Sequence, residues 1–570
     1  MPTLNWDKRQ HAEKTLTQVP YRLLKQESEF RSSIAGTTSH SDNILVQGDN
    51  LEALNALLPL YEGQVKCIFI DPPYNTGSAF THYDDNLEHN VWLAMMYPRL
   101  KLLHRFLCPT GFIAVHLDDA EGHYLKVMMD EICLRENYLV TIYSVVRYAE
   151  KTLKQDMDFH KRVEQVHIYR KSIAAKPNRP TSNVSHDKYV FSIHENGTPI
   201  QIKLGGKTVD VFKKGDWSIQ STEPSVNSLK EIWATGSILD GNSSGRFFRD
   251  YLAGRTSIDG LGALYKVSGI GDDELPYRYF TGPQRPKATK GKYYQGVPIN
   301  KRNLENIESS PIDNSYDFSS EFGNCRTEGD ADFRSGKKPE TYLKLLLETF
   351  TNQGDLVLDS FLGSGSTAAV AQKMGRRWIG IEMGEHARTH CVPRLQNVIN
   401  GDQTGISESL RWQGGGGFAF YTLGEAVFLP NGHINPKIKF DELAQYVWQS
   451  VTRSFSAYTT PKIDEKESPI KTISSQIQNP TEHKDATPLL GIHNDVVYFL
   501  LYNGILRDRR PEGGNVLTPA LWQWLLTLVP PLQTKKLRYV VYGEACQISK
   551  SRRDAIGLEF KQMPYKLSKV

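Results

Sequence analysis

The sequence predicts an α/β fold built around an open, largely parallel sheet. Two segments support this most directly, because each is a short apolar strand that ends in a sharp turn: residues 67–74 and 356–370. A third segment, residues 43–54, has the pattern of a strand, a turn and a helix. Strands that alternate with helices along a chain are typical of such a sheet.

The remaining elements follow from apolar spacing. Residues 1–40 are polar and are expected to form an extended arm with one helix. The other expected elements are, in order, a helix over 92–108, a strand over 111–117, a helix from Asp118-Asp119 through Asp130, a strand pair over 140–147 and 164–170 that closes the sheet, a helix over 342–350 and a strand over 377–382.

The first turn, Asp71-Pro72-Pro73-Tyr74, presents a carboxylate, a fixed carbonyl and an aromatic ring together. Two prolines hold φ near −65° and remove two N–H donors, so the direction of the Pro72 carbonyl is set. Such a group suits the amino edge and the face of an adenine or a cytosine. Taken alone, the tetrapeptide is better explained as a Pro-Pro turn after a strand, and the second turn described next reverses this preference.

The second turn contains Gly363 and Gly365 between an apolar strand and a helix. Glycines let the backbone approach a ligand closely, and the helix offers its N-terminal N–H groups. The next strand ends in Glu382, an acid that suits the hydroxyl pair of a ribose. A nicotinamide or flavin site would have much the same pattern.

The two turns in this order resemble the β class of amino-methylating DNA methyltransferases, and most closely the modification subunits of type III restriction-modification systems. In that family the Asp-Pro-Pro-Tyr half comes first, a target recognition region follows, and the cofactor half comes last. The resemblance covers residues 40–175 and 330–400 well, the middle loosely and the C-terminal part poorly. It implies a Rossmann-like, S-adenosylmethionine-dependent methyltransferase sheet with circularly permuted motif order, an inserted α+β domain and a small C-terminal α/β domain.

The resemblance also implies a reaction, the transfer of a methyl group from S-adenosylmethionine to N6 of a flipped-out adenine in double-stranded DNA. Asp71 and the Pro72 carbonyl, fixed by Pro73, would accept the two amino N–H bonds, and Tyr74 would stack on the base. Lys338-Pro339 matches a family element beside the cofactor pocket, although Arg334-Ser-Gly replaces the usual His-Pro-Thr lead-in. The residues expected to bind the cofactor are Asp49, Lys338, Asp359, Phe361, Gly363, Gly365, Ser366, Thr367 and Glu382. For Asp49, the N-cap of the following helix is an equally good interpretation.

The expected domains follow the motif order. They are an N-terminal arm (1–40), a catalytic half (41–175), a target recognition domain (176–330), a cofactor-binding half (331–405), a linker region (406–488) and a C-terminal domain (489–570) that docks a partner or merely extends the structure. Within the C-terminal domain, Asn503-Gly504 predicts a hairpin turn.

A basic stretch of the middle region is a candidate DNA surface. Residues 281–302 carry six Lys or Arg and no acid, with two tyrosines interleaved. Basic side chains with stacking aromatic rings suit nucleic acid, although a solvated loop has the same composition. The residues assigned to DNA binding are Arg285, Lys287, Lys290, Lys292, Tyr293 and Tyr294.

The whole chain, 570 residues with a net charge of +4, has the composition of an ordinary water-soluble protein. Its six cysteines form no C-x-x-C pair, so reduced thiols and no metal site are expected. The N-terminus has no secretory pattern and no apolar run reaches about 18 residues, so we expect a cytoplasmic protein. The expected partners are double-stranded DNA, a second copy of the chain and a separate helicase or nuclease subunit. The separate subunit is expected because the sequence has no G-x-x-x-x-G-K-[ST] phosphate loop for ATP-driven work.

Other functions remain open on the sequence. Methylation of RNA or of a protein amide is one of them, although those enzymes usually carry the cofactor turn before the proline tetrapeptide. N4-cytosine methylation uses the same amino-group chemistry. A specificity subunit with a relic catalytic half would keep the DNA-binding domain, although intact Asp71 and Gly363 argue against it. A dinucleotide-dependent oxidoreductase would explain the glycine turn but not the Asp-Pro-Pro-Tyr turn. Cytosine-C5 methylation is disfavoured because the Pro-Cys dipeptide of that family is absent from the sequence.

Overall fold

The computed structural model divides the chain into two units, residues 1–178 together with 313–570, and residues 179–312. The residues that the structure describes are 3–34, 43–75, 87–150, 158–234, 243–271, 273–303, 307–330, 333, 336–429, 431, 433–453, 487–529 and 537–563.

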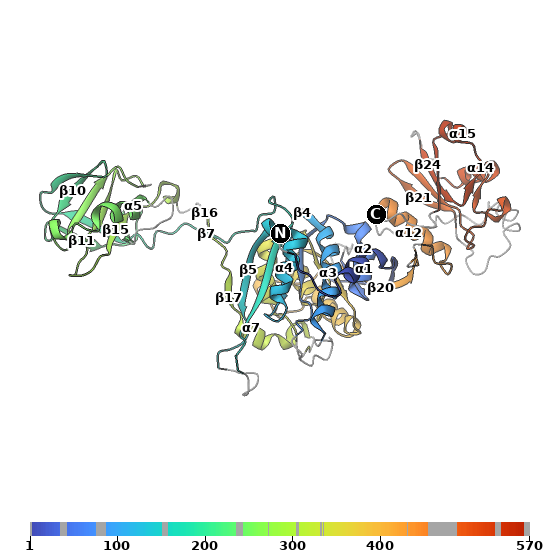
Figure 1. The fold of residues 1–570 in the computed structure, drawn as a ribbon, viewed down its shortest axis with the longest axis horizontal. Coiled ribbons are helices and arrows are strands. Elements are labelled where there is room, and N and C mark those ends of the chain that lie inside the picture. Colours follow the sequence, from blue (N-terminus) through green and yellow to red (C-terminus); the bar gives the residue numbers. More distant parts are fainter. Residues whose placement is uncertain are drawn as a thin grey trace. The chain divides into compact units, whose positions relative to one another are not determined.

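The first unit is built on a ten-stranded sheet (Figure 1). Its strands, in spatial order, are β1 (Arg22–Arg31), β20 (Gly417–Ala426), β2 (Ile44–Gln47), β19 (Arg377–Glu382), β18 (Leu356–Asp359), β3 (Val65–Ile70), β4 (Leu107–Leu117), β6 (Val163–Arg170), β5 (Tyr138–Val145) and β17 (Ser315–Asp317). The strands from β20 to β4 are parallel to one another, whereas β1 and β6 run antiparallel to their neighbours. This is the predicted Rossmann-like sheet, and the prediction is confirmed.

The order of the strands explains how two distant parts of the sequence form one site. β18 and β19, from the later half of the chain, lie between β2 and β3, from the earlier half. β18 pairs with β3 in parallel, through Val357 opposite Cys67 and Leu358 opposite Ile68. The turns that follow these two strands therefore leave the same edge of the sheet side by side.

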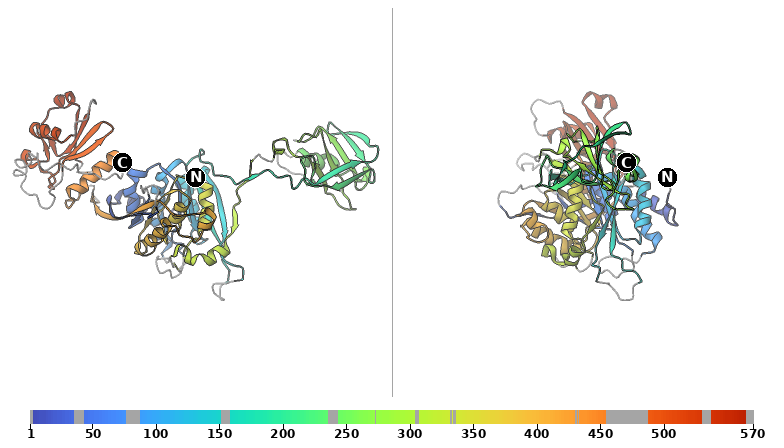
Figure 2. Two further views of the ribbon diagram at one scale, coloured as in Figure 1. Left: turned by 180° about the vertical axis from the view of Figure 1, so that it is seen from behind. Right: turned by 90° about the vertical axis from the view of Figure 1, so that its left-hand side faces the viewer.

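Helices cover both faces of the sheet, as the two further views in Figure 2 also show. One face packs against α1 (Arg9–Gln18), α2 (Asn50–Tyr61), α3 (His89–Phe106) and α4 (Gly122–Cys133). The other face packs against α8 (Glu340–Phe350), α9 (Ser366–Lys373) and α10 (Val392–Ile399). Side chains of a strand alternate between the faces, so Ile68 and Ile70 join the first core while Cys67 and Phe69 join the second.

The second unit is mainly β structure. Its largest sheet orders β12 (Lys230–Ala234), β15 (Gly291–Gln295), β14 (Tyr277–Thr281), β13 (Leu264–Ser268), β10 (Lys207–Phe212) and β9 (Ile200–Leu204). Two further strand pairs join β11 (Trp217–Ser221) to β8 (Phe191–Glu195) and β16 (Ile307–Ser309) to β7 (Thr181–Asn183). Short helices α5 (Ser243–Phe247) and α6 (Thr256–Asp259) complete the mixed architecture.

The C-terminal part of the chain contains a four-stranded sheet. Its order is β21 (Leu489–His493), β22 (Val496–Leu500), β24 (Arg538–Gly543) and β26 (Leu558–Gln562), with helices α14 (Pro519–Thr527) and α15 (Lys550–Ala555). The hairpin predicted at Asn503-Gly504 is wrong. The antiparallel turn lies before β22, at Asn494-Asp495, where both residues have positive φ, and β22 then pairs in parallel with β24.

Two domain expectations also need correction. The N-terminal arm is not simply extended, because β1 pairs with β20 at the edge of the main sheet. The expected linker over 406–488 contains β20 itself, whose Phe418 and Phe420 are buried, and the helix α12 (Phe440–Thr452). Burial of these aromatic rings on the second face outweighs the flexibility suggested by the preceding glycines. The polar run 456–488 lies almost entirely outside the described residues.

All six cysteines are free. Within the described part of the chain, the helices are all too short or too polar to cross a membrane. The same residues contain no group of three or more His, Cys, Asp or Glu that could hold a metal ion.

Candidate active site

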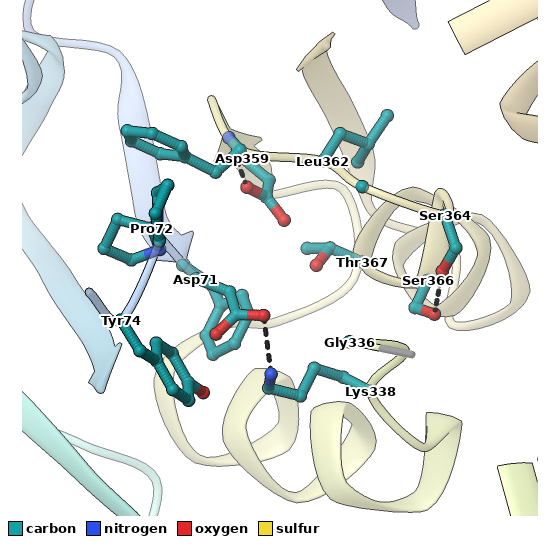
Figure 3. A pocket seen from close by; sticks show the side chains of 14 residues that line it. Asp71, Pro72, Tyr74, Gly336, Lys338, Asp359, Leu362, Ser364, Ser366 and Thr367 are labelled. Carbon is teal, nitrogen blue, oxygen red and sulfur yellow. Dashed lines mark hydrogen bonds and ion pairs between the residues drawn. The ribbon is translucent and has the colours of Figure 1, made fainter. Parts of the chain in front are cut away.

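A pocket opens where β3 and β18 end, at the edge where the sheet joins the two halves of the chain (Figure 3). Ligands of open α/β sheets bind outside the carboxyl ends of the strands, at the place where the order of the strands changes. The pocket is lined by Phe69, Asp71, Pro72, Pro73, Tyr74, Gly336, Lys338, Asp359, Phe361, Leu362, Gly363, Ser364, Ser366 and Thr367. The two predicted turns thus form one pocket.

Asp71 uses only one of its two carboxylate oxygens within the described residues. Oδ2 accepts a hydrogen bond from Lys338 Nζ at 2.5 Å. Oδ1 is buried and makes no hydrogen bond. A buried carboxylate oxygen without a partner is rare, because its desolvation is not offset. Oδ1 therefore keeps an unused capacity to accept a hydrogen bond.

The rest of the tetrapeptide is held from behind. The Pro73 carbonyl accepts a hydrogen bond from the Trp92 indole at 2.7 Å, which fixes the turn against α3. Tyr74 Oη donates to a carboxylate oxygen of Glu164 at 3.1 Å, and Lys338 Nζ lies 5.2 Å from the centre of the Tyr74 ring. Burial and the neighbouring Asp71 carboxylate raise the pKa of Tyr74 well above its usual value, so the phenol stays protonated.

Two residues that the sequence reasoning missed lie behind this turn, His116 on β4 and Glu164 on β6. His116 is fully buried, with Nδ1 4.0 Å from Asp71 Oδ1 and Nε2 3.1 Å from Glu164 Oε2. The second distance suits an ion pair, although Nε2 makes no hydrogen bond of normal geometry. Burial opposes ionisation of Glu164, but His116, Lys338 and Arg147 outweigh it and lower the pKa of Glu164 to about 2. A polar residue inside an apolar strand was the only signal that the sequence gave.

The glycine turn forms the opposite wall of the pocket. Asp359 ends β18 and its Oδ1 accepts the backbone N–H of Phe361 at 2.9 Å. Burial raises the pKa of Asp359 to about 7, and the Asp71 and Glu382 carboxylates add to this effect. Gly363 and Gly365 have φ of 58° and 83°, the left-handed region that glycine adopts without strain. The predicted turn therefore requires glycine at both positions.

A buried network of charged residues supports the glycine turn from below. Arg394, with no exposed surface, donates to Ser366 Oγ at 2.7 Å and to Glu340 at 2.8 Å. Lys373 bridges Glu340 and Asp402, at 2.8 and 2.5 Å. Each of these charges has an opposite partner, as buried charges require. The network fixes the start of α9 beside the pocket.

Three predicted cofactor residues do not line the pocket. Glu382 accepts the backbone N–H groups of Gly363 and Gly384, at 2.7 and 3.2 Å. Asp49 caps α2 by accepting the N–H of Leu51, as in the alternative interpretation, and pairs with Arg99 at 2.8 Å. Gly365 belongs to the glycine turn but is not among the residues that line the pocket. A contact between the cofactor and any of these three residues stays a prediction. Of the unusual lead-in, Arg334 and Ser335 lie outside the described residues.

The predicted DNA surface of the second unit is only partly exposed. Tyr293 and Tyr294 are 7% and 4% exposed and belong to its hydrophobic cores, so the prediction that they stack on bases is wrong. Lys292 on β15 pairs with Glu231 at 2.6 Å and is not a free cation. These three residues are part of a strand, whose pairing and packing the composition of the segment does not reveal. Arg285, Lys287 and Lys290 precede the strand and are exposed.

Comparison with known proteins gives one family match over a continuous part of the chain. Residues 65–391 match the model of the N6/N4 methyltransferase family, described as DNA methylase. A probable type III restriction-modification enzyme HindVI Mod subunit from Haemophilus influenzae is 31% identical over 70% of this chain and 56% of its own length. The type III restriction-modification enzyme StyLTI Mod subunit from Salmonella typhimurium is 25% identical over 64% of this chain and 54% of its own length. Among solved structures, the PvuII DNA methyltransferase (cytosine-N4-specific) is 14% identical, with a TM-score of 0.33 over 68% of this chain and 94% of that one.

The family model spans more than half of the chain and includes both pocket turns. The chain belongs to the N6/N4 DNA methylase family, and the predicted family is confirmed. The chain spans little more than half the length of the two Mod subunits that it matches.

Proposed function

We propose that this chain is a site-specific DNA methyltransferase that transfers a methyl group from S-adenosylmethionine to N6 of adenine in double-stranded DNA. The observation that carries the proposal is the buried Oδ1 of Asp71, which accepts no hydrogen bond within the described residues, in a pocket shared with the glycine turn. The amino group of adenine supplies the N–H that this oxygen lacks. Adenine, not cytosine, is the base that the resemblance to type III modification subunits implies.

The side chains that line the pocket suit a positively charged methyl donor. Two carboxylates, of Asp71 and Asp359, face it, while Lys338 is the only cationic side chain among the described residues that line it. S-adenosylmethionine, when bound, supplies an electrophilic methyl group on a positively charged sulfur. Asp359, Phe361 and the hydroxyl-bearing residues Ser364, Ser366 and Thr367 would hold it against the glycine turn. These residues fit the group, because carboxylates and hydroxyls match its positive and hydroxyl-bearing parts.

The catalytic turn prepares the amine of the base. The lone pair of an adenine amino group is delocalised into the ring, which makes the nitrogen a poor nucleophile. Acceptance of its two N–H bonds by Asp71 Oδ1 and the Pro72 carbonyl draws the nitrogen toward sp³ geometry. Tyr74, fixed by Glu164, stacks on the ring, a contact worth about 1–3 kcal/mol in single-strand binders. Most of the rate enhancement then comes from positioning.

The target base must leave the duplex to reach this pocket. Flipping costs a few kcal/mol for unstacking and unpairing, and backbone contacts elsewhere must offset it. We assign these contacts and the reading of the sequence to residues 176–330, whose exposed Arg285, Lys287 and Lys290 suit phosphates. The separate unit covers residues 179–312, so it begins close to the expected bound but leaves residues 313–330 with the first unit, where β17 pairs with β5.

We further propose that the chain acts in a restriction-modification system, as the names of its relatives indicate for those proteins. In this assembly the chain would pair with a second copy and with a separate helicase or nuclease subunit. The C-terminal sheet, β21 to β26, would serve as the docking module. Cytoplasmic location follows from this role.

The direct test uses purified chain, S-adenosylmethionine with a labelled methyl group, and duplex DNA. The DNA is digested to nucleosides after the reaction and the labelled product is identified by chromatography. N6-methyldeoxyadenosine is expected. Labelled N4-methyldeoxycytidine would assign the alternative base, and no labelled nucleoside with any duplex would contradict the proposal.

A further inference from the structure

His116, held by Glu164, occupies a place that the chemistry of the pocket turns does not explain. Burial of an ionisable pair costs free energy. The neighbouring buried side chains of β4 are apolar. In β4, His116 lies directly after Val115, which pairs with Ile70 at the end of β3. The sheet register therefore fixes the imidazole behind Asp71.

We propose that His116 acts through Asp71 as the temporary acceptor of the proton that leaves the target amine, and that Glu164 stabilises the resulting cation. The proposal rests on the proposed methyl transfer and assigns two positioning residues to it. Asp71 Oδ2 is occupied by Lys338, so Oδ1 is the oxygen that meets the amine on one side and His116 on the other.

The protons and electrons balance along this path. The amino nitrogen forms a bond to the methyl carbon, the bond from that carbon to sulfur breaks, and its electron pair remains on sulfur. The excess proton of the nitrogen passes to Asp71 Oδ1 and then to His116 Nδ1. His116 is fully buried, so the proton returns through Asp71 to water after the methylated base leaves.

Two carboxylates lie close enough to His116 to stabilise the positive charge that a transferred proton brings. The titratable groups that face it are Asp71 and Tyr74 from the end of β3, Glu164 from β6 and Tyr342 from α8. Tyr342 Oη lies 3.4 Å from Nδ1, and burial together with the carboxylates of Glu164 and Asp71 raises its pKa well above the usual value. Two carboxylates and two neutral phenols therefore surround the ring. Lys338 and Arg147 lie on the far side of these carboxylates.

One distance must shorten for the transfer to occur. His116 Nδ1 and Asp71 Oδ1 are 4.0 Å apart, beyond hydrogen-bond reach. Catalytic hydrogen bonds are often long without substrate and tighten in the reacting complex. We expect entry of the base against Tyr74 and Asp71 to shorten this distance, which the proton transfer from Asp71 to His116, here called the relay, requires.

The test compares His116→Asn with a matched control, His167→Asn. His167 on β6 is also buried, and its two ring nitrogens lie 2.9 Å from Thr141 Oγ1 and from the Gly122 carbonyl, away from the pocket. The single-turnover rate of methyl transfer is measured against pH at saturating S-adenosylmethionine, so that the weaker cofactor binding expected when Asp359 is protonated does not contribute. Cofactor affinity, the thermal melt, and flipping of 2-aminopurine at the target base are measured as well. His116→Asn should slow the chemical step by about 100-fold, the lower end for acid-base groups, and remove the acid limb of the wild-type pH profile. Cofactor affinity and flipping should not change.

The relay is overturned if His116→Asn keeps the wild-type rate and pH profile, if His167→Asn slows the step equally, or if flipping falls in proportion to the rate. Glu164→Gln is the second variant, and it decides the question alone if His116→Asn does not fold. It keeps a partner for Tyr74 but removes the negative charge, so the acid limb should move to lower pH. An unmoved limb overturns the relay. A wild-type chain that methylates no DNA would overturn the proposed function as well, whereas a wild-type profile in both variants overturns the relay alone.

Discussion

Asp359 provides a prediction about pH, because its carboxyl is buried at the wall of the cofactor pocket. Its pKa is raised from 3.8 to about 7, first by burial and then by the Asp71 and Glu382 carboxylates. This difference of about three pH units corresponds to about 4 kcal/mol. The folded chain holds the proton more tightly than the unfolded chain, so this contribution favours folding at low pH. It is lost as the pH rises from 3.8 to 7.

A cationic ligand should bind best when Asp359 is ionised. Half of the carboxyls carry a charge near pH 7 and about a tenth near pH 6, so the affinity for S-adenosylmethionine should fall about tenfold from pH 8 to pH 6. Isothermal titration calorimetry at the two pH values measures this change directly. Binding at pH 6 should also release a proton, which titration in buffers of different ionisation enthalpy reveals.

Asp359→Asn is the control for this experiment, since the amino group of the ligand titrates as well. The variant should bind more weakly at pH 8 and lose the part of the pH dependence that belongs to the protein. Its melting temperature should exceed that of the wild type at pH 8 but not at pH 4, because the buried charge is gone. Equal wild-type affinities at pH 6 and 8, or the same pH dependence in the variant, would refute the reasoning.

Three further predictions concern the two pocket walls and the second unit. Asp71→Ala should abolish methyl transfer while cofactor affinity by calorimetry stays near wild type, and a variant with normal turnover would contradict the assigned chemistry. Gly363→Val should block cofactor binding, because φ of 58° is strained for a β-branched residue; unchanged affinity in a folded variant would exclude this. Neutralising Arg285, Lys287 and Lys290 together should weaken binding to cognate and scrambled duplexes alike and lower the salt slope by about 0.9 for each phosphate that these side chains neutralise in the wild type. Fluorescence anisotropy over a salt series measures the slope, and an unchanged value would make the segment a solvated loop.

The two pocket turns could be predicted from the sequence because each is a local pattern. Asp71 follows an apolar strand and is fixed by two prolines, and Gly363 stands between a strand and a helix. Their meeting in one pocket depends on the parallel pairing of β3 with β18, across almost 300 residues of chain. That pairing could be inferred only from the family resemblance, since neither strand specifies its neighbour.

Other features depend on contacts that no local pattern encodes. His116 and Glu164 belong to different strands and become neighbours only through the register of β4 with β6. Tyr294 has the composition of a nucleic-acid contact, but its ring packs in a core and its hydroxyl donates to Glu231. The edge strand β1 alternates weakly between buried and exposed side chains, and its pairing with β20 is a long-range contact.

The most direct test of the central claim is to sequence single molecules of DNA from a methylation-free host that expresses the chain. This measurement reports the modified base, the surrounding motif and the strand together. We expect N6-methyladenine at one short motif with the wild-type chain and none with Asp71→Ala. Unmodified DNA from the wild-type host, or equal methylation with the Asp71→Ala variant, would contradict the assignment of Asp71 and its pocket to the methylation of adenine.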